Sequence, residues 1–67
     1  MAGTFIKEEV YDKVEQELVQ LLYKIDLLDD YISFGDHKGV GARQVELMKE
    51  QLKYMRLYAG VLEERLL

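Results

Sequence analysis

The chain has 67 residues, 49% of them hydrophobic and 33% charged, and nine lysines and arginines against thirteen aspartates and glutamates give a net charge of −4. This length allows one small domain, in which the burial of apolar surface alone gives only marginal stability. The chain has no cysteine and a single histidine, His37, which excludes disulfides, thiolate metal sites and a histidine zinc cage. The acidic balance argues against duplex nucleic acid as a partner, because binding to phosphates requires clustered lysine and arginine.

The sequence contains no apolar run long enough for a membrane-spanning helix or a signal peptide. We therefore expect a cytoplasmic protein with no membrane partner. No motif points to a bound metal or another cofactor, so we expect none.

Residues 5–33 contain neither glycine nor proline and are expected to form a helix. Apolar residues recur along this segment at alternating steps of three and four, which is the heptad spacing of a coiled-coil stripe. The stripe consists of Tyr11, Val14, Leu18, Leu21, Ile25, Leu28 and Ile32.

A second helix is expected over residues 44–66, where the same spacing recurs in Val45, Met48, Leu52, Met55, Ala59, Leu62 and Leu66. Residues 34–43 hold three of the five glycines, and glycine ends helices and permits turns. Two long helices joined by a short loop run antiparallel and pair along their stripes. The sequence therefore predicts a single all-α domain over residues 1–67, an antiparallel two-helix hairpin.

Both segments carry more apolar residues than one stripe requires. A lone hairpin would leave this second set in water, and a contiguous exposed apolar patch indicates an interface. We therefore expect a homo-oligomeric helical bundle. The additional residues are Phe5, Ile6, Val10, Val19, Leu22, Leu27 and Tyr31 in the first segment and Leu47, Leu57, Tyr58 and Val61 in the second.

Charge is divided unequally between the two segments. Residues 4–33 hold three basic residues against eight acidic ones, a net charge of −5, whereas residues 43–67 hold five against four, a net charge of +1. One interpretation is charge complementarity between the helices at the edges of their stripes. The alternative is that the second helix turns a modestly basic surface toward an anion.

The glycine-rich loop is the most informative segment for function. It leads into a helix N-terminus, where free backbone N–H groups bind anions and glycines allow a phosphate to approach closely. The candidate ligand-binding residues are Lys38 and Arg43 for charge, His37 as a further donor, Gly39 and Gly41 for backbone approach, and Tyr31 and Phe34 for stacking on a ring. The alternative is a turn in which glycine serves geometry and the charges are solvated.

Two tyrosines of the second helix, Tyr54 and Tyr58, share one helical face at a spacing of four residues. Aromatic residues in this pattern usually belong to a core or an interface, and in an oligomer they can line a groove that binds a ligand. Catalysis is not expected. His37 has Asp36 as a neighbour, but no nucleophile with a recognisable signature accompanies them.

The second helix reads Gln51, Leu52, Met55, Tyr58, Val61, Leu62 and Arg65 at regular spacing, and the first ends in Leu18, Leu21, Ile25, Leu28 and Ile32 ahead of Phe34. In these residues the chain resembles a family of small helical-hairpin proteins of tailed phages, including crAss-like phages. At the level of the fold it is also similar to the phage hairpins that act as anti-CBASS and anti-Thoeris nucleotide sponges. It departs from the first family at the start of the second helix, where Gly39, Gly41 and Arg43 replace the expected cap and acids.

The resemblance implies a phage-encoded, non-catalytic protein of the host cytoplasm that sequesters a cyclic nucleotide or an ADP-ribose-type immune signal. In this hypothesis Arg43 and Lys38 neutralise phosphate, loop amides donate to it, and Phe34 or Tyr31 stacks on the base. The alternative is a protein–protein interaction module that inhibits a host factor or serves the virion, acting through its apolar helical face.

Overall fold

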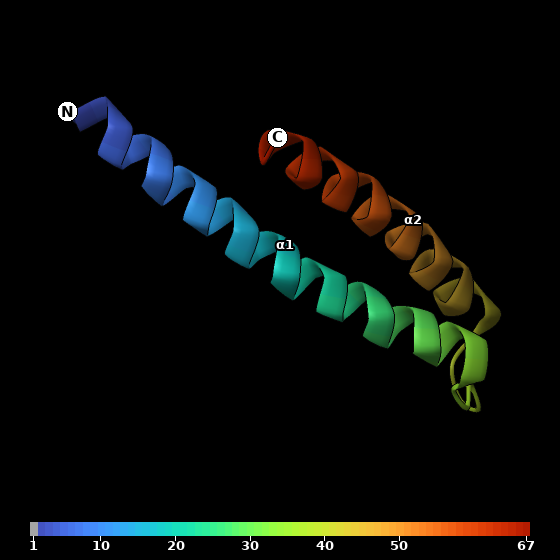
Figure 1. Ribbon diagram of the computed structural model, residues 1–67. Helices are drawn as coiled ribbons and strands as arrows, with labels where there is room; N and C mark the ends of the chain where they lie inside the picture. Colours follow the sequence, from blue (N-terminus) through green and yellow to red (C-terminus); the bar gives the residue numbers. More distant parts are fainter. Residues whose placement is uncertain (1) are drawn as a thin grey trace.

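The computed structural model describes residues 2–67, with side chains from residue 9 onward. Helix α1 (Ala2–Phe34) and helix α2 (Ala42–Arg65) run antiparallel and are joined by a loop over residues 35–41 (Figure 1). The expected all-α hairpin is therefore confirmed. The helices begin and end within three residues of the bounds expected from the sequence, 5–33 and 44–66.

The two heptad stripes pack against each other along the hairpin. Among the residues whose side chains are described, the buried hydrophobic ones all belong to these stripes: Val14, Ile25, Leu52, Ala59 and Leu62. We call the packed contact between the two stripes the seam. Its centre is a cluster of Ile25, Leu52 and Ala59, on which half-buried stripe residues pack. Tyr11, near the open end of the hairpin, is the stripe residue that stays most exposed, at 37%.

The helices differ in length, because α1 has 33 residues and α2 has 24. At 1.5 Å per residue, the first turns of α1 extend past the end of α2 by about 13 Å. The result is a narrow rod with extents of 56 × 15 × 15 Å, with the loop at one end and both termini toward the other (Figure 1).

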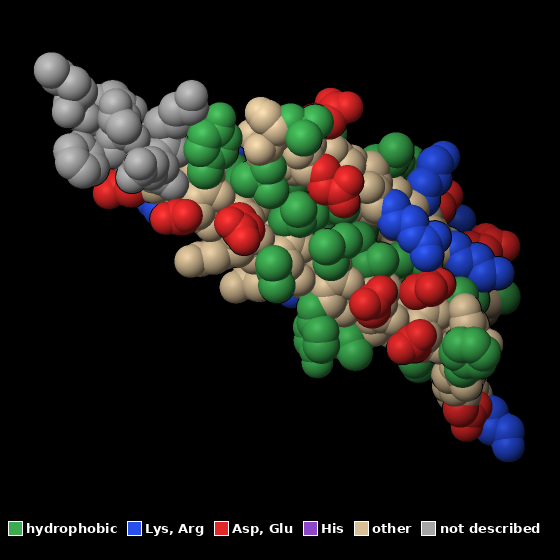
Figure 2. Space-filling model, viewed as in Figure 1, with side chains coloured by type: hydrophobic (Ala, Val, Ile, Leu, Met, Phe, Trp, Pro, Cys, Tyr) green, Lys and Arg blue, Asp and Glu red, His purple; other side chains and the backbone are tan. Residues whose placement is uncertain are grey.

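The seam has two different sides, which the cross-helix contacts distinguish. On one side Arg56 Nη2 lies 3.5 Å from Asp29 Oδ1. On the other side the Tyr58 hydroxyl donates a hydrogen bond to Glu17 Oε1. We call the side that carries Arg56 and Asp29 the charged side. Figure 2 shows one face of the hairpin, on which basic side chains gather over the first half of α2, with acidic side chains over α1 beside them.

We call the side of the seam that carries Tyr58 and Glu17 the aromatic side. It is identified by Tyr58 and by a hollow of about 350 Å³ between the helices, lined by Lys24, Leu27, Leu28, Tyr31, Gln51 and Met55. Residues three, four and seven positions apart share a helical face, which extends this side along α2. The aromatic side comprises Leu27 and Tyr31 on α1 and Leu47, Gln51, Tyr54, Tyr58 and Val61 on α2.

Most of the second apolar set expected from the sequence is exposed in the hairpin. Val19 is 61% exposed, Leu57 59%, Leu27 and Val61 53% each. Phe5 and Ile6 also belong to that set, but their side chains lie outside the described part. The homo-oligomer that the sequence predicts from this set remains a prediction. In the described part of the chain, neither helix is both long and apolar enough to span a membrane.

Candidate functional site

The C-terminal end of α1 is closed by His37, which folds back onto Tyr31. The His37 Nε2 atom lies 2.8 Å from the Tyr31 carbonyl oxygen and donates a hydrogen bond to it. The two rings pack with their centroids 5.0 Å apart and their planes inclined by 46°. The same carbonyl accepts the Gly35 N–H at 2.9 Å, so a side chain and a backbone group together satisfy a helix-end acceptor.

Lys38 follows a turn that Asp36 shapes. The Asp36 Oδ1 atom accepts the Lys38 backbone N–H at 2.9 Å, and the Asp36 carbonyl accepts the Tyr31 hydroxyl at 3.5 Å. An aspartate that accepts the N–H two residues on makes an Asx turn, a signal that is readable in the sequence. Gly39 then adopts φ +79°, a left-handed conformation that glycine reaches without the steric cost of a Cβ.

Gly41 is the N-cap of α2, with φ −66° and ψ 151° and no side chain capping the first turn. Its carbonyl accepts the N–H groups of Gln44 and Val45 at 3.0 and 3.2 Å. The N–H groups of Ala42 and Arg43 lie in the first turn, where a helix offers no internal acceptor. These amides suit an anion, whereas the Val40 N–H already donates to the His37 carbonyl at 2.9 Å.

Arg43, the candidate cation at this helix start, has an exposed side chain. Its Nη1 atom lies 3.6 Å from Glu46 Oε2 one turn later. Exposed ion pairs of this kind contribute about 0–1 kcal/mol, so an incoming phosphate can displace Glu46. The sequence interpretation of Arg43 did not include this competing carboxylate.

The two aromatic residues proposed for stacking differ in their surroundings. Phe34, the last residue of α1, is 86% exposed, whereas Tyr31 is half-buried and already in contact with His37. Of the two, Phe34 offers the larger free surface to a flat ring.

Tyr54 and Tyr58 lie away from the loop. Tyr54 is 12 residues beyond the start of α2, about 18 Å along the helix at 1.5 Å per residue. Lys53 Nζ lies 5.8 Å from the centre of the Tyr54 ring, a cation–π contact. The candidate residues therefore form two groups, one at the loop and one on the aromatic side, and Tyr31 belongs to both.

The hydrogen bond to Glu17 changes the acidity of Tyr58. The Glu17 carboxylate accepts that bond and, with some desolvation and its own negative charge, raises the pKa of the Tyr58 phenol above its usual 10.0, while Arg65 opposes the shift. A phenol with a raised pKa stays neutral at physiological pH, so it acts here as a donor that joins the helices.

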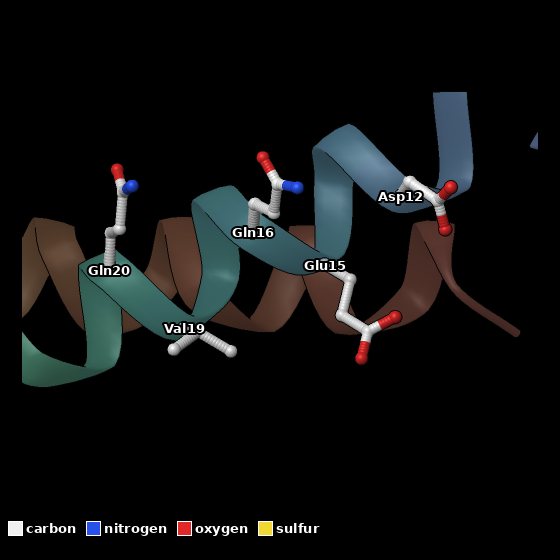
Figure 3. Close-up of a pocket in the computed structure, with 5 residues that line it drawn as sticks. All are labelled: Asp12, Glu15, Gln16, Val19 and Gln20. Atoms are coloured by element: carbon white, nitrogen blue, oxygen red, sulfur yellow. The ribbon is translucent and has the colours of Figure 1, made fainter. Parts of the chain in front are cut away.

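A further hollow, of about 440 Å³, lies on α1 and is lined by Asp12, Glu15, Gln16, Val19 and Gln20 (Figure 3). All five side chains come from one helix, and α2 lies behind them. Because its only charged groups are carboxylates, this hollow disfavours an anionic ligand. Within the described residues there is also no group of three or more histidine, cysteine, aspartate or glutamate side chains that could hold a metal ion.

The protein is a small helical hairpin. Its loop end carries the cations Lys38 and Arg43, the first-turn amides of α2 and the exposed ring of Phe34. The chain belongs to the Sequestin family, whose model matches residues 8–67 and so covers α1 from residue 8 onward, the loop and the whole of α2. The family name denotes sequestration, which is binding rather than catalysis. No curated protein and no solved structure matches the chain.

Proposed function

We propose that this protein sequesters, without cleaving it, a small phosphate-bearing nucleotide, of the class of cyclic nucleotides and ADP-ribose derivatives used as immune signals. The observation that carries the proposal is membership of the Sequestin family across almost the whole chain. A phage-encoded sponge that assembles as a homo-oligomer in the host cytoplasm is the biological setting that fits this function.

The loop end supplies the chemistry that such a ligand needs. Arg43 and Lys38 neutralise phosphate, and the first-turn amides of α2 donate to its oxygens. The space around Gly39 and Gly41 is open to a phosphate, since a Cβ at either position would meet no atom within 4 Å. Phe34 stacks on the base, with Tyr31 and His37 forming the wall beside it.

Calorimetry against a panel of cyclic dinucleotides and cyclic ADP-ribose isomers tests this function. Arg43→Ala removes a charge-assisted hydrogen bond, which contributes about 1.5–3 kcal/mol, so we expect affinity to fall about 10- to 150-fold. The matched control is Lys49→Ala, which removes the same charge from an exposed position further along α2 and should leave affinity within about twofold.

Recovery of the ligand separates binding from turnover. We expect nucleotide released by heat denaturation to be chemically intact, whereas hydrolysis products would indicate an enzyme. If Arg43→Ala bound as tightly as the parent protein, the ligand would lie elsewhere, and the group around Tyr54 and Tyr58 would be the next place to test.

The exposed aromatic side favours a second candidate function, a module that binds another protein. An inhibitor of a host factor or a virion accessory protein would use this surface and would need no nucleotide. A folded protein that binds no member of the nucleotide panel would favour this second function over sequestration.

A further inference from the structure

We propose that the aromatic side is occupied by a second copy of this chain, so that two hairpins form a four-helix bundle with both loops at the same end. The proposed function includes an oligomer of unspecified form, and this inference gives it an interface and an orientation. It does not depend on any ligand.

The spacing of residues on the aromatic side selects an α-helix as the occupant. Along α2 the exposed hydrophobic residues of this side lie seven, four and three positions apart, and they are Leu47, Tyr54, Tyr58 and Val61. This is the heptad spacing of the stripe that already packs on α1, so α2 carries two coiled-coil stripes on adjacent faces. A helix with two such stripes is typical of a bundle in which it contacts two neighbouring helices.

Partly buried residues of the seam emerge on the same side, where Leu28 and Met55 line the hollow between the helices. A second hairpin laid over this hollow would continue the existing core rather than begin a separate one. The face is about 36 Å long, from the 24 residues of α2, and about 20 Å wide across two helices, giving about 700 Å². That area is close to the roughly 800 Å² per partner of a stable interface.

Net charge favours one of the two ways in which the helices of the two copies can pair. Within the bounds of α1 the net charge is −5, and within those of α2 it is +1. On the aromatic side itself α1 carries Glu17 and Lys24, one charge of each sign. The preference therefore comes from the whole helices, because α1 against α1 of the copy adds like net charge and α1 against α2 of the copy pairs opposite net charges. When a two-fold axis relates the two hairpins, placing α1 over α2 of the copy puts both loops at the same end of the dimer, and placing α1 over α1 puts them at opposite ends.

The interface is tested by two valine variants of nearly equal exposure. Val61 lies on the aromatic side and is 53% exposed, and Val19 lies in the acidic hollow of α1 and is 61% exposed. Because a carboxylate buried without a partner is costly, Val61→Glu should weaken dimerisation at least about tenfold. Val19→Glu should leave the dissociation constant within about twofold, since its side chain stays in water.

Sedimentation across a range of concentrations, without nucleotide, measures both constants, and circular dichroism at high concentration reports whether each variant is still helical. A parent protein that is a folded monomer, or a dimer that Val61→Glu leaves intact, would overturn the inference. Either result is independent of the calorimetry, so failure of the interface and failure of the nucleotide function are distinguishable.

The orientation is tested with one spin label on each copy. The chain has no cysteine, so the exposed Lys38 can be replaced as Lys38→Cys and labelled uniquely. Loops at the same end place the two labels well below the 56 Å length of the hairpin, and loops at opposite ends place them near that length or beyond it. The longer distance would rule out the pairing of α1 with α2 of the copy.

Discussion

Individual residues at the loop end divide into those that hold the turn and those whose side chains are exposed. His37, Asp36 and Gly35 are engaged with Tyr31 or with the backbone, whereas Arg43 and Phe34 are exposed. The sequence suggests His37 as a further donor to a ligand, and in the hairpin its Nε2 atom donates to the Tyr31 carbonyl. In the hairpin His37 therefore holds the Tyr31 ring and closes the end of α1.

Substitution by alanine should affect the stability of the hairpin differently at Gly35 and at Gly41. A Cβ on Gly35 would lie 2.4 Å from the Tyr31 carbonyl oxygen and 2.7 Å from its Cδ1, and a Cβ on Gly41 would meet nothing within 4 Å. We expect Gly35→Ala to lower the free energy of unfolding by about 1–3 kcal/mol and Gly41→Ala to change it by less than about 1 kcal/mol. Thermal denaturation measures both.

Gly41→Ala also separates stability from binding. If the amides at the start of α2 hold phosphate, this variant should bind nucleotide more weakly while it melts close to the parent protein. Equal destabilisation by the two alanine variants would contradict the close approach of Gly35 to Tyr31.

Tyr58 should make the stability of the hairpin depend on pH in the alkaline range. The phenol is a donor only when neutral, and its pKa is raised in the folded protein, so its hydrogen bond to Glu17 contributes fully below the usual pKa of 10.0. That contribution is lost as the pH rises through the folded pKa, because the unfolded phenol ionises first.

We therefore expect the parent protein to lose more stability than Tyr58→Phe between about pH 9 and about pH 11, where tyrosine titrates. Denaturant unfolding at each pH measures the difference. Tyr54→Phe is the control, since Tyr54 is exposed and its contact with Lys53 is to the ring rather than the hydroxyl. A parent protein and a Tyr58→Phe variant with parallel pH profiles would show that the hydrogen bond contributes nothing to stability.

At the scale of the helices, the residues of the seam could be predicted from the sequence, because heptad spacing is a property of each helix taken alone. Every buried residue of the described part falls at a position that the alternating steps of three and four predicted, Leu52 and Leu62 among them. The ion pair between Arg56 and Asp29 likewise agrees with the expected complementarity of charge between the helices. The division into a charged and an aromatic side was not readable, because it depends on the register in which two separate helices pair.

Leu52 is a residue of α2 at the centre of the seam. It is 6% exposed and packs with Ile25 and Ala59, so Leu52→Asp would bury an unpaired carboxylate. The cost of about 3–5 kcal/mol is comparable to the whole stability of a domain of this size, and we expect the variant to be unfolded.

Circular dichroism measures this loss of helix. Leu57→Asp makes the same change five residues later on the same helix, where the side chain is 59% exposed, and should remain helical. Retained helix in Leu52→Asp would mean that the helices do not depend on this seam.

At the scale of the whole molecule, the rod combines one closed seam, an exposed aromatic side and one loop end with exposed cations. The hairpin and its turn were predictable, since three glycines fall between two uninterrupted heptad stripes. The rise of a helix also predicts that Tyr54 lies about 18 Å from the start of α2. That Tyr31 of α1 shares a side with Gln51 and Met55 of α2 was not predictable, because it depends on the register in which the two helices pair. The acidic hollow around Val19 likewise depends on which face of α1 is turned away from α2 (Figure 3).

The hairpin topology also sets an order in which contacts can form during folding. The contact of His37 with Tyr31 closes a stretch of six residues, and the contact of Tyr58 with Glu17 closes one of 41. The entropy lost on closing a stretch of chain grows with its length, so the turn forms at the least cost and each later contact is brought near by the one before it. Folding of a single hairpin therefore proceeds from the loop toward the termini, and unfolding begins at the open end. Truncated side chains near the loop should slow folding, whereas those around Val14 and Leu62 should mainly speed unfolding.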